Sequence, residues 1–211
     1  MQTELCKLMK EHGSDKATWH NYTLFYYDIF LPFKDKALNF FELGLGTKNA
    51  NIPSNMTRID AHAETKPGGS LRAWEKFFSN AIIYGADIDR NILFQSDRIH
   101  TFYCDQTDPK TIYDLWNNDI LKNLTFDIII DDGLHTIDAN ICFLQNSLKK
   151  LSKDGVYIIE DISLKKMPLY NETLLRLTES LFFNHKIIPF NHYINNHDNA
   201  ICLITHEETP Q

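Results

Sequence analysis

Short apolar runs alternate along the chain with longer segments in which apolar residues recur every three or four positions. Apolar runs of strand length that are rich in β-branched and aromatic residues are typical of buried strands. Seven such runs occupy residues 38–44, 81–88, 99–105, 126–132, 155–161, 185–190 and 200–206. Their alternation with helical patterns predicts βαβ units, because parallel strands need a crossover between them. We therefore expect an α/β fold: a doubly wound, Rossmann-like, seven-stranded and mostly parallel sheet with helices on both faces.

Amphipathic helices are predicted between these strands, at residues 70–80, 108–121, 136–155 and 169–183. Ser70 and Asp108 are suited to cap the first two, and Gly155, preceded by lysines, is suited to end the third. The first 30 residues are partly helical and aromatic, with a turn at 12–16. The pattern predicts a helical segment over residues 1–36, followed by one α/β domain over residues 37–211.

One polar segment, residues 47–69, separates the first strand from its helix. Connections of this type usually have about 2–6 residues, so the segment is an insertion. Long loops beside strand ends often carry function. Two interpretations are open: a lid over a site, or an insertion that is structurally idle or contacts another subunit.

Composition and charge limit the classes of partner. With 211 residues, 43% of them hydrophobic and 23% charged, the chain has the composition of a soluble globular protein. A formal net charge of −7 argues against nucleic acid and anionic membranes as partners. The sequence has no run of about 18 apolar residues that would span a membrane, and its first residues lack a secretory apolar region. We expect a cytoplasmic protein that acts on a small molecule, and a homo-oligomer stays open.

The first strand ends in the pattern Glu42-x-Gly44-x-Gly46. Glycines at a strand end let the backbone turn sharply and approach a ligand, and a carboxylate there can accept hydrogen bonds from that ligand. A nicotinamide dinucleotide site would have a third glycine and a helix directly afterwards, whereas Asn49 follows here. The pattern therefore favours a close ligand contact over a pyrophosphate cradle.

Polar residues also follow the second and third strands. Asp87 is placed to hold both hydroxyls of a ribose. Asp105 and Gln106 are placed to read an adenine amino group. Asp89 and Asp108 are explained more simply as helix caps.

Carboxylates gather at the ends of the fourth and fifth strands, in the stretches FDIIIDDGLH (126–135) and VYIIEDI (156–162). Neighbouring strands lie about 4.8 Å apart, so Asp131 and Asp132 are expected beside Glu160 and Asp161. Like charges at such spacing require protons or a cation, and a cluster of oxygen ligands suits Mg²⁺, Mn²⁺ or Ca²⁺. The sequence therefore predicts a site for a hard divalent cation.

His135 follows Asp132 by three residues, on the turn that leaves the strand. A histidine beside such a cluster can act as a general base near neutral pH. Two other roles are open: a direct metal ligand, or a residue that only caps or packs against the following helix.

Together these stretches resemble a known family. FFELGLGT, GGSLRAWEKFFSNAIIYGADID, CDQTD, FDIIIDDGLH and GVYIIEDI, in this order, are similar to class I S-adenosylmethionine-dependent methyltransferases. Within that class they resemble the metal-dependent sugar O-methyltransferases of macrolide pathways, of the macrocin and mycinamicin type. The segment HGSDKATWHNYTLFYYDIF also resembles the leading segment of that group, so the resemblance covers residues 8–162.

The resemblance implies roles for individual residues. S-adenosyl-L-methionine would meet Glu42, Gly44 and Gly46 at its methionine end, Asp87 at its ribose, and Asp105 with Gln106 at its adenine. Mg²⁺ or Mn²⁺ would be held by Asp132, Glu160 and Asp161, with His135 as the base. The chain differs from the family in the 47–69 insertion and in having no room for the further N-terminal domain of some macrolide enzymes. Both differences leave the acceptor and the assembly open.

The function implied is methyl transfer to a sugar hydroxyl of a surface polysaccharide or a glycosylated natural product, presented as a small molecule or a sugar nucleotide. A catechol-type acceptor is an alternative, because a catechol offers the same metal-chelating diol. Two functions of other classes are also open: an NAD(P)-dependent oxidoreductase, and a non-catalytic binding protein with this fold.

Overall fold

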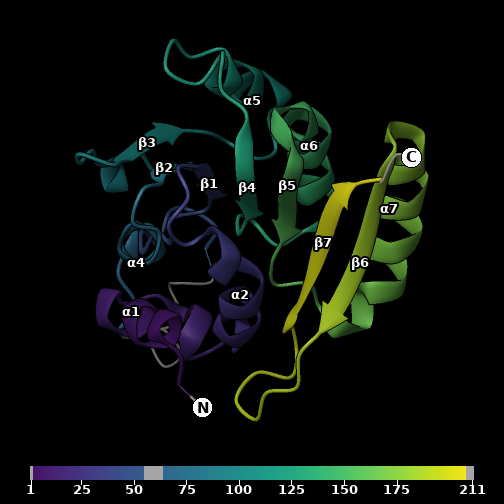
Figure 1. Ribbon diagram of the computed structural model, residues 1–211. Helices are drawn as coiled ribbons and strands as arrows, with labels where there is room; N and C mark the ends of the chain where they lie inside the picture. Colours follow the sequence, from purple (N-terminus) through teal and green to yellow (C-terminus); the bar gives the residue numbers. More distant parts are fainter. Residues whose placement is uncertain (1, 55–63, 208–211) are drawn as a thin grey trace.

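The computed structural model describes residues 2–54 and 64–207, which form a seven-stranded sheet in the order β3-β2-β1-β4-β5-β7-β6 (Figure 1). The strands are β1 (Asn39–Leu43), β2 (Ile82–Asp87), β3 (Ile99–Tyr103), β4 (Phe126–Asp131), β5 (Leu151–Ile159), β6 (Phe183–Pro189) and β7 (Ala200–His206). Strands β1 to β5 are parallel, and β7 is antiparallel to both β5 and β6. The predicted strands and the predicted fold class are confirmed.

Helices cover both faces of the sheet (Figure 1). One face carries α1 (Glu4–His12), α2 (Tyr22–Phe30) and α4 (Gly69–Phe77), and the other carries α5 (Pro109–Trp116), α6 (Ile137–Ser147) and α7 (Met167–Leu181). Single-turn helices are η1 (Asp15–Ala17), η2 (Leu31–Phe33), η4 (Arg90–Ile92), η5 (Leu148–Lys150) and η6 (Leu164–Lys166). Strand β4 shows the consequence: Ile128 and Ile130 pack into the core on one face, and Ile129 packs into the core on the other. Its apolar run is continuous because both faces are buried.

Two predicted helix ends are wrong. Helix α4 is capped by the left-handed Gly68, because the hydroxyl of Ser70 donates instead to the buried Glu42 carboxylate at 2.6 Å. Helix α6 ends at Ser147, and β5 already begins at Leu151, which pairs with Phe126. The lysine signal before Gly155 has another explanation, since the Lys150 ammonium donates to the backbone carbonyls of residues 121 and 122, both at 2.9 Å.

The caps predicted after the second and third strands are confirmed. Asp108 accepts a hydrogen bond from the Lys110 amide at 2.9 Å, at the start of α5. Asp89 accepts one from the Asn91 amide at 3.0 Å, at the start of η4.

The N-terminal helices pack on the sheet through an aromatic cluster around Trp74. The Trp74 ring lies 5.8 Å from that of Tyr26, 5.7 Å from that of Phe30 and 5.1 Å from that of Phe40, measured between centroids. Helix α2 thereby lies beside the carboxyl ends of β4 and β5 (Figure 1). The predicted segment 1–36 shares one apolar core with the sheet, which places its polar residues near the strand ends.

Part of the predicted insertion, residues 55–63, lies outside the described residues. The described residues that follow this gap are hydrogen-bonded to other parts of the fold. The amide of Lys66 donates to the carbonyl of Gly13 at 2.9 Å, and that of Gly68 donates to the carbonyl of Leu45 at 2.7 Å.

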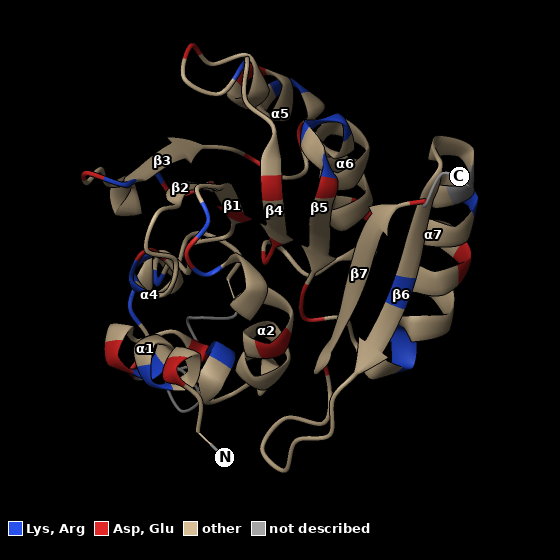
Figure 2. Ribbon diagram, in the orientation of Figure 1, with Lys and Arg blue, Asp and Glu red and all other residues tan. Residues whose placement is uncertain are grey.

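The surface helices carry mixed charge. Figure 2 shows acidic and basic residues side by side on α1 and on α7, as is usual for solvated helix faces. Within residues 2–54 and 64–207, none of the helices is long and apolar enough to cross a membrane.

Candidate functional site

A cavity of about 480 Å³ opens at the carboxyl ends of the central strands. It lies where β1 and β4 are neighbours and the winding of the sheet reverses, the place where doubly wound folds bind ligands. Of the predicted site residues, those that line it are Gly44, Gly46, Asp87, Asp105, Gln106, Asp132, His135 and Asp161. Glu42 and Glu160 are 0% and 1% exposed and lie behind its wall. The N-terminal segment and the loop between β6 and β7 complete the lining, with Lys16, Trp19, His20, Asn195, His197 and Asp198 among their residues.

Gly44 holds the ends of β1 and β4 together. Its φ is 90°, and a Cβ atom at this position would lie 1.9 Å from the carbonyl oxygen of Asp132. The amide of Asp132 donates to the carbonyl of Leu43 at 2.9 Å in the same place. Glycine is required here because only its backbone tolerates both the conformation and the close approach.

Glu42 is engaged on both of its oxygens. Oε1 accepts from the Ser70 hydroxyl at 2.6 Å, and Oε2 accepts from Trp74 Nε1 at 2.7 Å. Burial raises the pKa of Glu42, against the opposing effect of the Lys16 ammonium at 3.6 Å. Direct contact between Glu42 and a cofactor stays a prediction.

The end of β2 is ordered by Asp87, which lines the cavity. Its Oδ2 accepts from the amide of Leu45 at 2.7 Å, and its Oδ1 accepts from the amide of Asp89 at 2.8 Å. The carboxylate thus ties the loop after β1 to the end of β2. At the end of β3, Asp105 accepts from the Thr107 amide at 2.9 Å.

Asp131 is the centre of a buried network that shapes the 131–135 turn. Gln106 Nε2 donates to both of its oxygens, at 2.6 and 2.8 Å, and Asn140 Nδ2 donates at 3.0 Å. Gln106 Oε1 in turn accepts from the Leu134 amide at 2.7 Å. Asn140 was not among the predicted residues; its only sequence signal is a polar residue among the apolar positions of α6.

Because Asp131 is buried in this network, the free energy of unfolding is expected to depend on pH. Burial raises the pKa of Asp131 to about 7, against the hydrogen bonds from Asn140 and Gly133. The folded state therefore keeps the proton to higher pH than the unfolded state, whose carboxyl has the ordinary value of 3.8. The stabilisation is complete below that value and is lost as the pH rises towards 7, by up to about 1.4 kcal/mol per pH unit.

We expect Asp131→Asn to flatten this fall in the free energy of unfolding, measured by urea denaturation at a series of pH values. Asp119→Asn is the control, because the Asp119 side chain is 93% exposed. An unchanged slope in Asp131→Asn would contradict the assignment.

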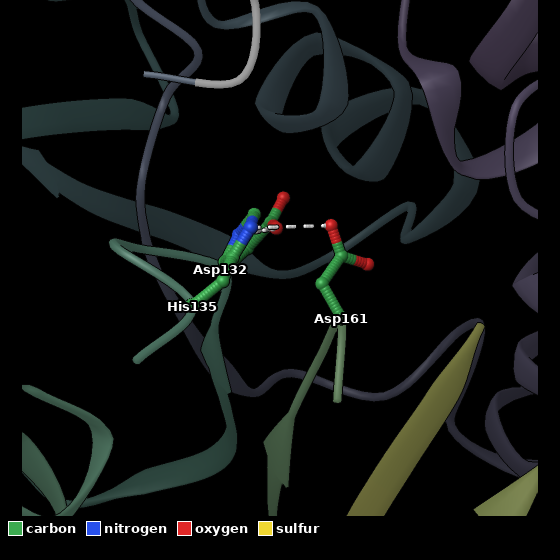
Figure 3. A group of neighbouring side chains, drawn as sticks. All are labelled: Asp132, His135 and Asp161. Carbon is green, nitrogen blue, oxygen red and sulfur yellow. Dashed lines mark hydrogen bonds and ion pairs between the residues drawn. The ribbon is translucent and has the colours of Figure 1, made fainter. Parts of the chain in front are cut away.

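Asp132, His135 and Asp161 converge at the cavity (Figure 3). His135 Nε2 lies 3.1 Å from Asp132 Oδ1, and His135 Nδ1 lies 3.5 Å from Asp161 Oδ2. One ligand atom from each residue falls within 4.8 Å of the others, a spacing at which the three could hold a metal ion. His135 and Asp161 have φ values of 58° and 55°. Left-handed conformations of non-glycine residues are strained and cluster at functional sites.

The charge on His135 is set by its two carboxylate neighbours. Burial lowers the pKa of His135, but Asp161 and Asp132 outweigh burial and raise it to about 10. Both carboxylates therefore favour the protonated form of the imidazole.

A buried lysine that was not among the predicted site residues completes the cluster. Lys16 is 1% exposed. Its Nζ lies 2.5 Å from Asp132 Oδ2 and 2.6 Å from Glu160 Oε2. Burial lowers the pKa of Lys16, but Asp132, Glu160 and Glu42 outweigh burial and raise it well above the ordinary value.

Three further residues of the N-terminal segment contact the same carboxylates. The hydroxyl of Tyr22 donates to Asp161 Oδ1 at 2.9 Å, and that of Tyr26 donates to Glu160 Oε1 at 2.6 Å. His20 Nε2 lies 3.3 Å from Asp161 Oδ1. The available sequence signal was the spacing of four between Tyr22 and Tyr26, which puts both on one face of α2.

The chain is similar in sequence to known sugar O-methyltransferases. No family model matches the chain. It is 33% identical over 166 residues, 79% of its length, to 8-demethyl-8-alpha-L-rhamnosyl tetracenomycin-C 2'-O-methyltransferase of Streptomyces olivaceus. It is 36% identical over 95 residues, 45% of its length, to demethylmacrocin O-methyltransferase of Streptomyces fradiae. These matches span 39% and 23% of the two relatives, so the chain corresponds to less than half of either.

Among solved structures, the chain is similar to the MycE methyltransferase of the mycinamycin biosynthetic pathway, which was solved in complex with Mg and SAH. The TM-score is 0.69 at 21% identity, over 98% of this chain and 55% of that one. At this identity the likeness shows the fold. The fold is that of a Rossmann-like methyltransferase, and the sequence resemblance to sugar O-methyltransferases is confirmed.

Proposed function

Because the chain is related to sugar O-methyltransferases and has their Rossmann-like fold, we propose that it is an S-adenosylmethionine-dependent, Mg²⁺-dependent O-methyltransferase acting on a sugar hydroxyl. The observation that carries the proposal is the Asp132–His135–Asp161 group at the cavity between β1 and β4. A sugar hydroxyl is a weak acid, and a bound metal ion together with a base makes it a better nucleophile. This group can hold the metal ion and can supply the base.

The cofactor would occupy the part of the cavity beside β1, β2 and β3. Gly44 and Gly46 would admit its methionine end, because both glycines have left-handed φ values and line the cavity. Asp87 would accept hydrogen bonds from the ribose, and Asp105 with Gln106 would lie at the adenine. Glu42 lies behind the wall of the cavity, so it would influence the cofactor indirectly, through its hydrogen bonds from Ser70 and Trp74.

The donor set fits a hard divalent cation. Asp132 and Asp161 present carboxylates to the cavity, and Mg²⁺ and Mn²⁺ both accept oxygen ligands of this kind. When bound, the cation would lower the pKa of a coordinated hydroxyl. Neutralisation of the two carboxylates would also remove the reason for His135 to stay protonated. We propose that the His135 imidazole takes the proton of the acceptor hydroxyl, and that Asp132 and Asp161 orient the ring.

The acceptor class comes from the relatives, which are named as enzymes of a rhamnosyl tetracenomycin and of demethylmacrocin. We propose a sugar of a glycosylated natural product, with a surface polysaccharide or a sugar nucleotide as the other forms of the same acceptor. A catechol acceptor and an NAD(P)-dependent oxidoreductase are less favoured, because neither agrees with these relatives. A cytoplasmic location, the absence of nucleic acid as a partner and a homo-oligomer stay predictions.

Calorimetry and a turnover assay test this function. We expect S-adenosylhomocysteine (SAH) to bind, and NAD⁺ and NADP⁺ to give no heat of binding. With S-adenosylmethionine and a panel of glycosides and nucleotide sugars, we expect methyl transfer that EDTA abolishes and Mg²⁺ restores, while SAH binding survives EDTA. Transfer that persists both in EDTA and in Asp132→Asn would refute the metal mechanism, and binding of NAD(P) without SAH would refute the methyltransferase.

A further inference from the structure

The loop between β6 and β7, residues 190–199, lines the cavity with Asn195, His197 and Asp198. The proposed cofactor contacts lie at the ends of β1, β2 and β3, on one side of β4, whereas β5, β7 and β6 lie on the other side. The loop is held beside the end of β5, because the amide of Leu164 donates to the carbonyl of His197 at 2.9 Å. This part of the cavity is therefore separate from the part assigned to the cofactor.

Hydrogen bonds join the loop to the N-terminal segment. His192 Nδ1 donates to the carbonyl of Trp19 at 3.1 Å, and Asn199 Nδ2 donates to Asn21 Oδ1 at 2.8 Å. Asn21 Nδ2 donates in turn to the carbonyl of residue 191 at 3.0 Å. Trp19 and the loop thus belong to one hydrogen-bonded wall of the cavity.

Asp198 is half-buried in this wall and is held by one of its two oxygens. Its Oδ1 accepts from Asn195 Nδ2 at 2.7 Å, and Asn195 Oδ1 accepts from the amide of His197 at 3.0 Å. Within residues 2–54 and 64–207, Asp198 Oδ2 has no hydrogen-bond partner. An ionised carboxylate oxygen only accepts hydrogen bonds, so a hydroxyl of a ligand is a suitable partner for Oδ2.

Trp19 is the aromatic part of the same wall. It is half-buried, and among the described residues it is the only Trp, Tyr or Phe that lines the cavity. Ligand sites combine apolar and aromatic surface with a few placed polar groups. A pyranose ring has C–H groups on its faces and hydroxyls at its edge, so it matches an indole next to a hydrogen-bond acceptor.

We propose that Trp19 and Asp198 form the acceptor subsite: the sugar ring packs against the Trp19 indole, and Asp198 Oδ2 accepts a hydrogen bond from a hydroxyl other than the one that is methylated. This inference rests on the proposed function, since it concerns the acceptor of the same reaction. It implies selection for sugars with a second free hydroxyl, because a site built to bond a hydroxyl discriminates against analogues that lack it.

Tryptophan fluorescence tests the Trp19 contact. The chain has three tryptophans, and Trp74 and Trp116 are 0% and 2% exposed, so acrylamide quenches mainly Trp19. The probe is methyl α-L-rhamnopyranoside, because one relative is named for a rhamnosyl compound. With SAH and Mg²⁺ present, we expect the glycoside to lower the acrylamide quenching constant of the wild type and of the control Trp116→Phe, but not that of Trp19→Phe. Unchanged quenching in the wild type would overturn the proposal.

Calorimetric titration with the same glycoside tests the Asp198 contact. We expect Asp198→Asn to bind it about 10- to 100-fold more weakly, the usual loss when a hydrogen bond to a charged group is removed. Asparagine keeps an Oδ1 for Asn195, so the loop keeps its own bond. SAH affinity should be unchanged, and Asp154→Asn, at an exposed position of β5, is the control. Wild-type glycoside affinity in Asp198→Asn would reduce Asp198 to ordering the loop and overturn the proposal.

Deoxy derivatives of the glycoside identify the hydroxyl that Asp198 contacts. We expect one of the derivatives lacking O2, O3 or O4 to bind the wild type about 10- to 100-fold more weakly than the parent. The same derivative should lose nothing more in Asp198→Asn, because both changes remove one shared hydrogen bond. Additive losses for all derivatives would contradict the contact.

The outcomes separate this inference from the proposed function. Protein that binds SAH but does not bind the glycoside would overturn the acceptor subsite. Protein that does not bind SAH would refute the proposed function itself.

Discussion

Replacing His135 by alanine is expected to lower the turnover number by about 10²- to 10⁴-fold, the usual contribution of a positioned general base. The imidazole lies at the cavity, 3.1 Å from Asp132 and 3.5 Å from Asp161, beside the carboxylates proposed to hold the cation. SAH affinity should not change, because the cofactor contacts proposed above involve other residues. The measurement is a steady-state assay at saturating cofactor and Mg²⁺.

The same variant separates the two chemical roles left open by the sequence. If His135 is a base, His135→Ala keeps its Mg²⁺ affinity and loses turnover; if it is a ligand, both fall together. His100→Ala is the matched control, since His100 bonds only Gln95 among the described hydrogen-bond partners and lies on β3. Wild-type turnover in His135→Ala would refute both roles and leave only packing.

The strands could be predicted because a buried parallel sheet imposes a pattern that local sequence carries. The apolar run 128–130 is explained by burial on both faces of β4. Helix ends were less predictable, because they depend on hydrogen-bond partners that lie far away in the sequence. Ser70 looks like a cap in the sequence, but its hydroxyl bonds Glu42, 28 residues away.

In the candidate site too, some residues could be predicted from local sequence and others could not. Asp132 and Asp161 could be placed near each other because the carboxyl ends of neighbouring parallel strands meet at one edge of the sheet. Lys16 could not be placed, because it lies 116 residues from Asp132 and 144 from Glu160 and belongs to a segment outside the sheet. Its docking depends on aromatic packing around α2 and α4, which no local pattern specifies.

Replacing Trp74 by alanine is expected to lower the free energy of unfolding by about 4–6 kcal/mol, enough to threaten a domain of ordinary stability. The Trp74 side chain is completely buried and packs against the rings of Tyr26, Phe30 and Phe40. Most of the loss comes from the cavity that alanine would leave. The rest comes from Glu42, which would stay buried without the Trp74 Nε1 donor at 2.7 Å.

Trp74→Phe separates these two contributions, because phenylalanine keeps much of the packing but has no donor, and the lost ring volume is matched in a control variant. We expect a loss of about 1–3 kcal/mol, the cost of depriving a buried charged acceptor of a hydrogen bond. Trp116→Phe is the control: Trp116 Nε1 donates to the neutral Ser147 hydroxyl at 2.9 Å, so its loss should be smaller. Urea denaturation followed by circular dichroism measures both. Equal losses in the two phenylalanine variants would show that the charge on Glu42 adds nothing to the strength of the Trp74 hydrogen bond.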